Sequence, residues 1–385
     1  MKTDICIIGG GITGLATAYN ISKTGNSRVL VLDRYGVENE YCSSNDVNRV
    51  FRYSYGNDEL YTRMAVESLV LWRELEKESR QELLTQTGLL LLKGGDKSAN
   101  GFNEASYRTL SRMGFEADRL TKTELKKRFP QFKAEEAFLD RHGGVLLASR
   151  ALHAFRSLAA SKGVRFRQGR ARKIASGDQL RLTTDTSETV EYRRLIVATG
   201  PWTESLLAPS FTLIRPTRQQ LIYFKPQAEL EQFNPRKCPV FFTDKHYGLP
   251  TAGINAVKMA PKELVETVDP ETAKRTVDDE QITSCREAFR RFVPKLEMSE
   301  VVRSKVCLYD MTDNSDFVLD RDPERSKIVY GYGFSGHGFK FAPLIGKLLA
   351  ELALDLEPSF DLERFSIVPS KRRKTATGSH LGKGE

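Results

Sequence analysis

The stretch Asp4–Arg34, DICIIGGGITGLATAYNISKTGNSRVLVLDR, decides the fold of this chain. Ile5–Ile8 is a short apolar run typical of a buried parallel strand, and Leu15–Ile21 has the apolar and small residues of a helix that packs on it. Arg28–Leu32 predicts a second strand, which ends at Asp33. This order of strand, glycine turn, helix and strand is typical of a dinucleotide-binding unit.

Three glycines between the first strand and the helix follow the spacing G-x-G-x-x-G. Gly9 permits a tight turn, Gly11 lets a pyrophosphate approach the backbone, and Gly14 lets the helix lie close to the strand. The helix N-terminus offers N–H groups and partial positive charge to the phosphates. Asp33, about 20 residues further on, can accept hydrogen bonds from both ribose hydroxyls. We predict a dinucleotide site, with a glycine-rich turn that binds no ligand as the alternative.

The bulk composition is that of a soluble enzyme rather than a nucleic-acid-binding protein. The 385 residues can bury a large core and are expected to form two domains. The net charge is +9, but the cations are dispersed apart from Lys371–Lys374, and no zinc spacing or nucleic-acid motif is present. We therefore expect a basic surface without a nucleic-acid partner, whose charge helps to attract an anionic substrate.

The five cysteines are odd in number and widely spaced, without a C-x-x-C pair. This pattern argues against a disulfide framework or a metal site and fits a reducing compartment. The first strand leaves no room for a signal peptide, and no apolar run approaches the roughly 18 residues of a membrane span. We expect a soluble, cytoplasmic protein that makes no contact with a membrane.

The remaining pattern predicts an α/β (α+β) protein with a discontinuous first domain. Parallel-type strands recur at Val190–Val197 and Lys327–Gly331, whereas proline-broken apolar runs over Thr212–Lys258 predict a mostly antiparallel second sheet. Other expected elements are helices over Asp58–Arg80, Ala273–Phe292 and Pro343–Leu354, a strand over Thr85–Leu92, and a hairpin of Val164–Ile174 with Gln179–Thr184. The predicted Rossmann-type domain comprises residues 1–85, 145–211 and 300–368. The second domain comprises residues 86–144 and 212–299. Residues 369–385 are predicted to form a basic, disordered tail.

Several separated motifs, spread over residues 3–368, resemble the D-amino-acid-oxidase-like flavoprotein superfamily, and within it the monomeric and peroxisomal sarcosine/pipecolate oxidases. They are the glycine fingerprint with Asp33, Arg49-Val50-Phe51-Arg52, Tyr55-Gly56, Gln86–Leu90 (QTGLL), Ala198–Trp202 (ATGPW), Val306–Tyr309 (VCLY) and Gly333–Lys340 (GFSGHGFK). The resemblance implies an FAD-binding domain plus a substrate domain with a mostly antiparallel sheet. It also selects FAD over NAD, which the glycine spacing alone leaves open.

The resemblance implies an activity: oxidation of a secondary (N-alkyl or cyclic) amino acid to an imine, with O2 reduced to H2O2, by a monomeric enzyme. Two alternatives stay open. The first is a dehydrogenase that passes electrons to a carrier other than O2, and the second is a non-catalytic protein that binds FAD or nucleic acid through its tail. A comparison of oxygen uptake with dye reduction distinguishes the oxidase from the dehydrogenase.

The matching motif positions imply catalytic roles. Arg52 and Lys340 match the two cations that hold the substrate carboxylate, and Arg49 matches an arginine close to the flavin. Lys258 matches the lysine at which O2 is activated, where a fixed cation stabilises developing negative charge. Tyr247 and Tyr309 match active-site tyrosines.

Cys307, in VCLY, matches a cysteine whose sulfur bonds the flavin 8α-methyl, with an ordinary buried strand cysteine as the alternative. The predicted cofactor-binding set is Gly9, Gly11, Ile12, Thr13, Gly14, Asp33, Arg34, Ser43, Arg49, Val50, Ala171, Thr199, Gly200, Trp202, Cys307, Gly336, Gly338 and Lys340.

The sequence also departs from the pattern of the sarcosine oxidases. Lys262 stands where they have an active-site histidine, and Asn57 replaces an acid. These changes favour a substrate bulkier or more anionic than sarcosine. His337 is expected to be structural. Ser379-His380-Leu381 looks like a peroxisomal address, but four residues follow it, so a receptor that reads the terminus should miss it.

Overall fold

The computed structural model describes residues 1–175, 180–206, 214–262 and 266–367. The predicted tail, its basic run and Ser379–Leu381 lie outside the described residues.

A six-stranded sheet carries the dinucleotide-binding unit. Its order is β19-β20-β13-β1-β2-β9, and every neighbouring pair is parallel except the edge pair β19–β20. The strands come from three distant parts of the chain: β1 (Ile5–Ile8) and β2 (Val29–Asp33), then β9 (Arg165–Gln168) and β13 (Arg194–Val197), then β19 (Val318–Arg321) and β20 (Ile328–Tyr332). The predicted discontinuous α/β architecture is confirmed.

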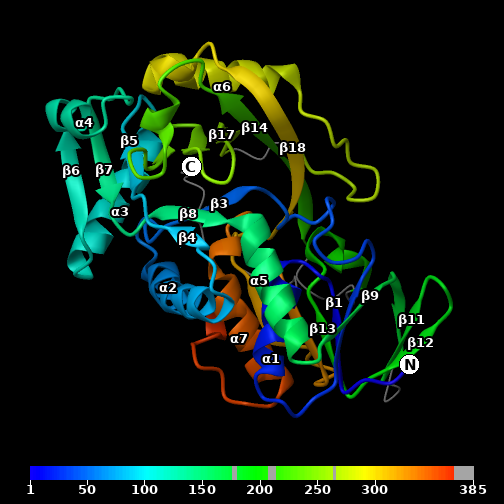
Figure 1. Ribbon diagram of the computed structural model, residues 1–385. Helices are drawn as coiled ribbons and strands as arrows, with labels where there is room; N and C mark the ends of the chain where they lie inside the picture. Colours follow the sequence, from blue (N-terminus) through cyan, green and yellow to red (C-terminus); the bar gives the residue numbers. More distant parts are fainter. Residues whose placement is uncertain (176–179, 207–213, 263–265, 368–385) are drawn as a thin grey trace.

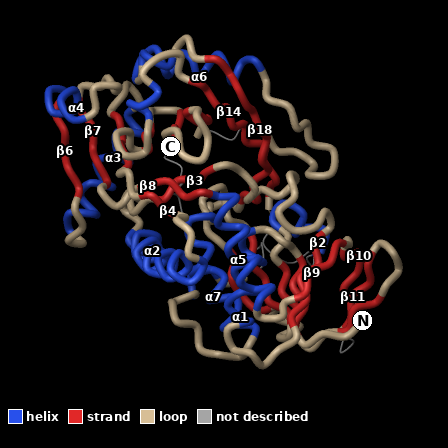
Figure 2. The backbone as a smooth tube through the Cα atoms, in the orientation of Figure 1, coloured by secondary structure: helices blue, strands red, loops and turns tan. Residues whose placement is uncertain are grey.

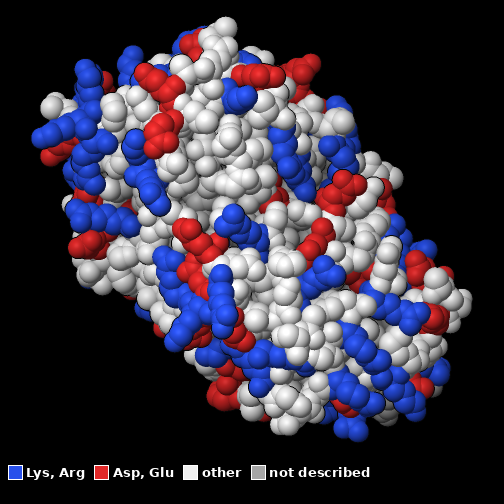
Figure 3. Space-filling view, viewed as in Figure 1, with Lys and Arg blue, Asp and Glu red and all other residues white. Residues whose placement is uncertain are grey.

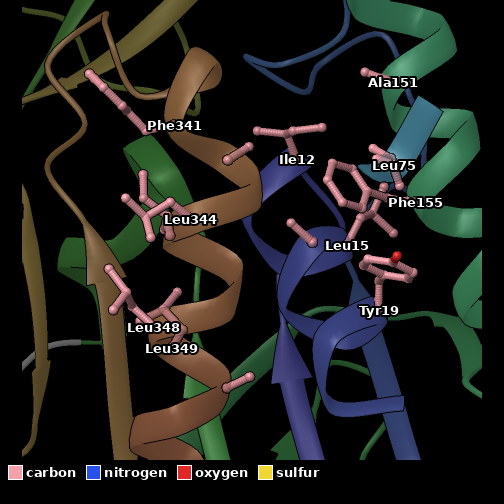
Figure 4. Close-up of a cluster of buried hydrophobic side chains, with 14 of the residues drawn as sticks. Ile12, Leu15, Tyr19, Leu75, Ala151, Phe155, Phe341, Leu344, Leu348 and Leu349 are labelled. Carbon is pink, nitrogen blue, oxygen red and sulfur yellow. The ribbon is translucent and has the colours of Figure 1, made fainter. Parts of the chain in front are cut away.

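Helices cover one face of this sheet, and α1 (Ile12–Ser22) is enclosed by the others (Figure 1). It lies between α5 (Ala148–Ser161) and α7 (Ala342–Ala353), as Figure 4 shows for Leu15, Tyr19 and Phe155. A Cβ on Gly346 would lie 2.5 Å from the Ala16 carbonyl carbon, so only glycine lets α7 approach α1 this closely. This contact explains why an apolar, weakly amphipathic segment forms a helix here.

A three-stranded sheet packs on the opposite face of the six-stranded sheet. It consists of β10 (Ala171–Ile174), β11 (Arg181–Thr184) and β12 (Thr189–Glu191). The predicted hairpin is therefore correct only for β10 and β11, which pair in antiparallel. The first part of the expected strand is β9, which leaves the hairpin because it extends the large sheet beside β2.

An eight-stranded sheet forms the other half of the molecule, in the order β18-β14-β17-β16-β15-β5-β7-β6 (Figure 1). Its pairs are antiparallel except β5–β15, so the predicted mostly antiparallel sheet is confirmed. α6 (Asp279–Phe292) covers it, and the Phe289 ring packs edge-on against Phe224 at 4.9 Å. The strands are β5 (Leu89–Leu92), β6 (Ala117–Thr121), β7 (Glu136–Asp140), β14 (Arg215–Lys225), β15 (Val240–Phe242), β16 (His246–Leu249), β17 (Val257–Pro261) and β18 (Glu300–Met311).

A small sheet lies between the two large ones (Figure 2). In it β8 (Gly144–Leu147) pairs with β3 (Asn48–Phe51) and β4 (Leu84–Thr85). The expected single strand over 85–92 is therefore wrong: β4 and β5 enter different sheets because the chain turns at Gly88, where φ is +75°. Around them lie α2 (Glu59–Ser79), which matches the predicted long helix, α3 (Lys97–Arg112) and α4 (Lys122–Arg128).

α6 begins six residues later than predicted, and a buried arginine explains why. Arg218 on β14 donates hydrogen bonds to the carbonyl oxygens of Lys274, at 3.0 Å, and of Thr276. The Asp278 N–H in turn donates to Gln220 Oε1 at 2.7 Å instead of to the Lys274 carbonyl, so the side chains of β14 satisfy the backbone groups of this segment outside a helix.

We propose that the domain boundaries follow the two large sheets. This division agrees with the predicted segments except at residues 300–311, because β18 pairs along its length with β14 in the eight-stranded sheet.

The face of the molecule seen in Figure 3 mixes Lys and Arg with Asp and Glu. None of the helices described is long and apolar enough to cross a membrane. Within the described ranges no three His, Cys, Asp or Glu side chains come together as a metal site would require. The cytoplasmic location and the monomeric state stay predictions.

Candidate functional site

A long cleft opens where the carboxyl ends of β1, β2 and β13 meet the loops that follow them. It has an empty volume of about 1260 Å³. We call it the dinucleotide cleft. The predicted cofactor-binding residues that line it are Gly9, Gly11, Ile12, Thr13, Asp33, Arg34, Ser43, Arg49, Ala171, Thr199, Gly200, Trp202, Gly336 and Gly338. Gly14, Val50, Cys307 and Lys340 do not line it.

The glycine turn has the geometry that a bound pyrophosphate needs. Gly9 has φ of +110°, and a Cβ there would lie 2.2 Å from the Ala198 carbonyl oxygen. A Cβ on Gly14 would lie 1.9 Å from the Gly9 oxygen, so Gly14 acts by letting α1 pack against the turn. At Gly11 the nearest atom to such a Cβ is 3.4 Å away. Space is therefore left beside Gly11 and the first N–H groups of α1, where an anion can bind.

Asp33 stands at the end of β2 and is held by backbone groups. It accepts hydrogen bonds from the N–H of Gly10 at 2.7 Å and of Tyr35 at 2.9 Å. Burial raises the pKa of Asp33, and the two backbone donors partly offset this effect. The carboxylate is thus fixed at the cleft wall, as a group that receives ribose hydroxyls must be.

Aromatic residues close the outer part of the dinucleotide cleft. The rings of Tyr35 and Tyr41 stack at 4.5 Å, and Trp202 meets Tyr35 edge-on at 6.3 Å. The Trp202 Nε1–H is buried and finds no hydrogen-bond partner among the described residues. An acceptor on a bound dinucleotide would satisfy this donor. The cleft, the glycine turn, Asp33 and this indole together fit FAD.

A second cavity, the inner chamber, adjoins the cleft. Its empty volume is about 780 Å³, and four of its lining residues, Arg49, Tyr309, Gly336 and Phe339, also line the dinucleotide cleft. The other residues that line it are Val50, Arg52, Phe102, Gln219, Phe242, Tyr247, Lys258, Lys262, His337 and Lys340. All six predicted catalytic residues therefore face one space.

Arg52 and Lys340 come together on Tyr55. The Arg52 guanidinium carbon lies 4.0 Å from the Tyr55 ring centroid, and Lys340 Nζ donates to the Tyr55 hydroxyl at 3.0 Å and to the His337 carbonyl oxygen at 2.7 Å. Both cations are almost fully buried. Burial, and then the nearby Arg52 charge, hold the pKa of Lys340 well below its usual value. A carboxylate would stabilise the protonated form of this lysine.

Lys258, on β17, belongs to a buried charge cluster centred on Asp46. Lys258 Nζ donates to an Asp46 carboxylate oxygen at 2.9 Å and to the Asn48 carbonyl oxygen at 2.5 Å. Arg49 and the Tyr223 hydroxyl donate to the same carboxylate. Burial lowers the pKa of Lys258 to about 8, although Asp46 opposes the shift. Burial by itself would raise the pKa of Asp46, but Lys258 and Arg49 outweigh it and hold that pKa below its usual value.

Cys307 and Tyr309 are two residues apart on β18. Cys307 lies beside Arg49, and Tyr309 lines the inner chamber. Arg49 Nη2 lies 3.6 Å from the Cys307 sulfur, which is buried, and 2.8 Å from the Ser43 carbonyl oxygen. Burial, followed by the influence of the nearby Tyr309 phenol, raises the pKa of Tyr247 well above its usual value, so this phenol stays neutral.

The residues that depart from the sarcosine-oxidase pattern lie in different places. Lys262 lines the inner chamber, whereas Asn57 is exposed and lines neither cavity. The expectation that the missing acid at Asn57 favours a bulkier or more anionic substrate stays a prediction, and the exposed position of that side chain does not support it. His337 is buried, within 3.3 Å of the Tyr55 hydroxyl and 3.0 Å of the Ser315 carbonyl oxygen, and it also lines the chamber.

Sequence analysis missed Asp46, Tyr55 as the bridge between the two cations, and the aromatic chamber walls Phe102 and Phe242. Asp46 sits in a polar loop, and only its spacing of three residues from Arg49 hinted at a pairing. The QTGLL and VCLY motifs lie at strands of the site. The first leads into β5, which pairs with β15, the strand that carries Phe242. The second lies in β18, which carries Cys307.

Comparison with known proteins agrees with this site. The family described as "DAO: FAD dependent oxidoreductase" matches residues 4–352. Peroxisomal sarcosine oxidase of Homo sapiens is 34% identical over 94% of this chain and 95% of that protein. Monomeric sarcosine oxidase of Bacillus sp. (strain B-0618) is 30% identical over 94% of this chain and 95% of that protein.

Solved structures share the fold. The amino acid oxidase NikD, in its open form, has a TM-score of 0.83 at 24% identity and covers 96% of this chain and 98% of its own. Glycine oxidase from Geobacillus kaustophilus has a TM-score of 0.83 at 22% identity, covering 97% of this chain and 100% of its own. The chain therefore belongs to the DAO family of FAD-dependent oxidoreductases and is an enzyme of that class.

Proposed function

We propose that this enzyme oxidises a secondary amino acid, N-alkylated or cyclic, to an imine and reduces O2 to H2O2. The observation that carries the proposal is one chamber that holds both a buried pair of cations, Arg52 and Lys340, and a separate buried lysine, Lys258, and that adjoins the dinucleotide cleft. The names of the sarcosine-oxidase relatives support the same reaction.

Arg52 and Lys340 would hold the substrate carboxylate. The Arg52 guanidinium and the Lys340 ammonium group are both held by contacts with Tyr55. In these fixed positions they can donate several charge-assisted hydrogen bonds to a carboxylate. The carboxylate would raise the pKa of Lys340, because an opposite charge favours the protonated amine. We therefore expect the substrate anion and a proton to bind together.

The reaction needs the neutral amine and a place for its electrons. Cations around the chamber lower the pKa of a bound ammonium group, which favours the neutral form without a strong general base. FAD in the dinucleotide cleft would supply hydride acceptance and electron transfer to O2. Lys258, protonated below its pKa of about 8, would stabilise the negative charge that develops on O2.

An anaerobic substrate screen tests the proposal. We expect N-methyl or cyclic amino acids to bleach the yellow FAD-loaded enzyme, and reoxidation in air to consume O2 and form H2O2. Bleaching followed by reoxidation with a dye but not with O2 would instead identify a dehydrogenase. If no amine bleaches the enzyme, the proposed activity is wrong, and salt-sensitive RNA binding would then favour a non-catalytic protein.

We propose that Cys307 binds FAD covalently. Its sulfur lies beside Arg49, and the next two residues, Leu308 and Tyr309, line the dinucleotide cleft. After acid precipitation the yellow colour should stay with the wild-type polypeptide and move to the supernatant in Cys307→Ser. The control is Cys42→Ser, because Cys42 also lines the cleft but lies in a different segment, before β3. Complete release of colour from the wild type would contradict the covalent bond.

A further inference from the structure

The loop that leads into α6 extends from the eight-stranded sheet toward the other half of the molecule (Figure 1). We call its residues 266–278 the strap. Both ends of the strap are fixed to β14: the Val268 N–H donates to the Pro216 carbonyl oxygen at 2.8 Å, and the Arg218 side chain donates to the Lys274 carbonyl oxygen at 3.0 Å. The strap is therefore anchored to one strand at both ends, and its middle can contact a different part of the molecule.

A tight turn in the middle of the strap presents Glu271. The Asp269 carboxylate accepts a hydrogen bond from the Glu271 N–H at 2.9 Å, and the Asp269 carbonyl oxygen accepts one from the Ala273 N–H at 2.9 Å. Such a side-chain bond to the backbone two residues on is typical of a fixed turn. The direction of the Glu271 side chain is thus set by the strap itself.

The Glu271 carboxylate binds two arginines that line the dinucleotide cleft. Its Oε2 lies 2.6 Å from Arg34 Nη1, and its Oε1 lies 2.8 Å from Arg170 Nη2. Arg34 directly follows β2, whereas Arg170 stands between β9 and β10. The three side chains are only partly exposed, at 33% for Glu271, 30% for Arg34 and 25% for Arg170. One carboxylate of the strap therefore joins two separate parts of the cleft wall.

The strap meets the aromatic part of the same wall at a second point. The Arg275 guanidinium carbon lies 5.8 Å from the centroid of the Tyr41 ring. Tyr41 in turn stacks on Tyr35 at 4.5 Å, and both tyrosines line the dinucleotide cleft. A cation over a ring is a weak attraction at an exposed site, so the ion pairs of Glu271 are the stronger fastening.

These contacts lie at the end of the cleft where Asp33 would receive a ribose. Arg34 is the next residue after Asp33, and Gly169, which precedes Arg170, donates its N–H to the Asp33 carbonyl oxygen at 2.9 Å. A molecule as long as FAD can enter or leave only when wall side chains move apart. While Glu271 is bonded to both arginines, those two side chains cannot swing away from the strap.

We propose that Glu271 latches the strap onto the dinucleotide cleft and thereby slows both the entry and the release of FAD. Partly exposed ion pairs are individually weak and are screened by salt, which suits a latch that opens and closes again. Glu271 itself does not line the cleft, so opening the latch changes the path of FAD more than the contacts of bound FAD. This inference concerns the loading of the cofactor and does not depend on which amine the enzyme oxidises.

The kinetics of FAD exchange test the latch. The background is Cys307→Ser, which removes the proposed covalent bond, and the test variant is Glu271→Gln, which keeps the shape of the side chain and removes its charge. We expect the rate constants for association and for release each to rise about 3- to 30-fold, the size of the loss of two partly exposed ion pairs. The Kd for FAD should change less than either rate constant. Stopped-flow flavin fluorescence measures both rates.

Salt dependence and hydrogen exchange add two readouts. Raising the salt concentration from about 0.1 M to 1 M shortens the Debye length from about 10 Å to 3 Å, so it should speed release more with Glu271 than with glutamine there. In the apoprotein, the amides of residues 266–278 should exchange faster in Glu271→Gln. The control is Glu188→Gln, because Glu188 pairs with Arg167 on the exposed side of β9 and neither residue lines the cleft.

Two outcomes would overturn the latch. The first is unchanged association and release in Glu271→Gln, and the second is faster release with unchanged or slower association, which would show that Glu271 contributes to affinity alone. If Cys307→Ser does not retain FAD, association of FAD with wild-type and Glu271→Gln apoprotein, expressed without riboflavin, decides between the same results.

Discussion

Replacement of Lys258 by methionine is expected to slow reoxidation of the reduced enzyme by O2 about 100- to 1,000-fold, the usual cost of removing one preorganised electrostatic group. Reduction by substrate should change little, because Arg52 and Lys340, the cations proposed to bind the substrate carboxylate, are untouched. Methionine fits the space of the lysine stem, and Asp46 keeps its bond from Arg49. Stopped-flow absorbance measures the two half-reactions separately.

The pH dependence of the wild type is a second test of the same role. Burial lowers the pKa of Lys258 to about 8, so its charge is complete well below that pH and is lost above it. The rate of reoxidation should therefore fall as pH rises through about 8, and the Lys258→Met variant should lack this step. Lys225→Met, at the exposed end of the neighbouring strand β14, is the control. Equal slowing of both half-reactions in Lys258→Met would remove the assigned role.

The first βαβ unit could be predicted from sequence because its signals are local. Strand β1, the glycine turn, helix α1 and Asp33 lie within one stretch, and each element has its own steric or apolar requirement. The same holds for α2, where Asp58 accepts a hydrogen bond from the Tyr61 N–H and Arg80 ends the helix in a left-handed conformation. Such elements depend little on the rest of the chain.

The missed features depend on contacts between distant segments. The residues of β9 would suit a strand of the predicted hairpin equally well. The strand belongs to the six-stranded sheet because it pairs with β2, which is distant in the sequence. Asp46 meets Tyr223 and Lys258, which are 177 and 212 residues away, so nothing in its loop distinguishes it from a surface acid. Motif matches identified the cations of the site, but the carboxylate that balances two of them became visible only in three dimensions.

Asp46→Asn should therefore be the most destabilising polar substitution at this site. It leaves Lys258 and Arg49 buried near each other without their carboxylate, and breaking a buried pair in this way costs about 3–5 kcal/mol in the free energy of unfolding. Asparagine has nearly the same shape and can still accept the Tyr223 hydrogen bond, so loss of charge is the main change. Denaturant titration of the FAD-loaded protein measures the loss.

The same variant separates stability from catalytic positioning. Asp46 raises the pKa of Lys258, whereas the charge of Arg49 lowers it, so removal of the carboxylate shifts the pKa of Lys258 below about 8. The pH above which reoxidation slows should then move to lower values in the folded fraction of Asp46→Asn. Asp118→Asn is the matched control, because Asp118 also binds two arginines, Arg128 and Arg141, but at the surface, where ion pairs contribute about 1 kcal/mol or less. An unchanged pH profile in Asp46→Asn would show that the carboxylate holds the fold together without tuning Lys258.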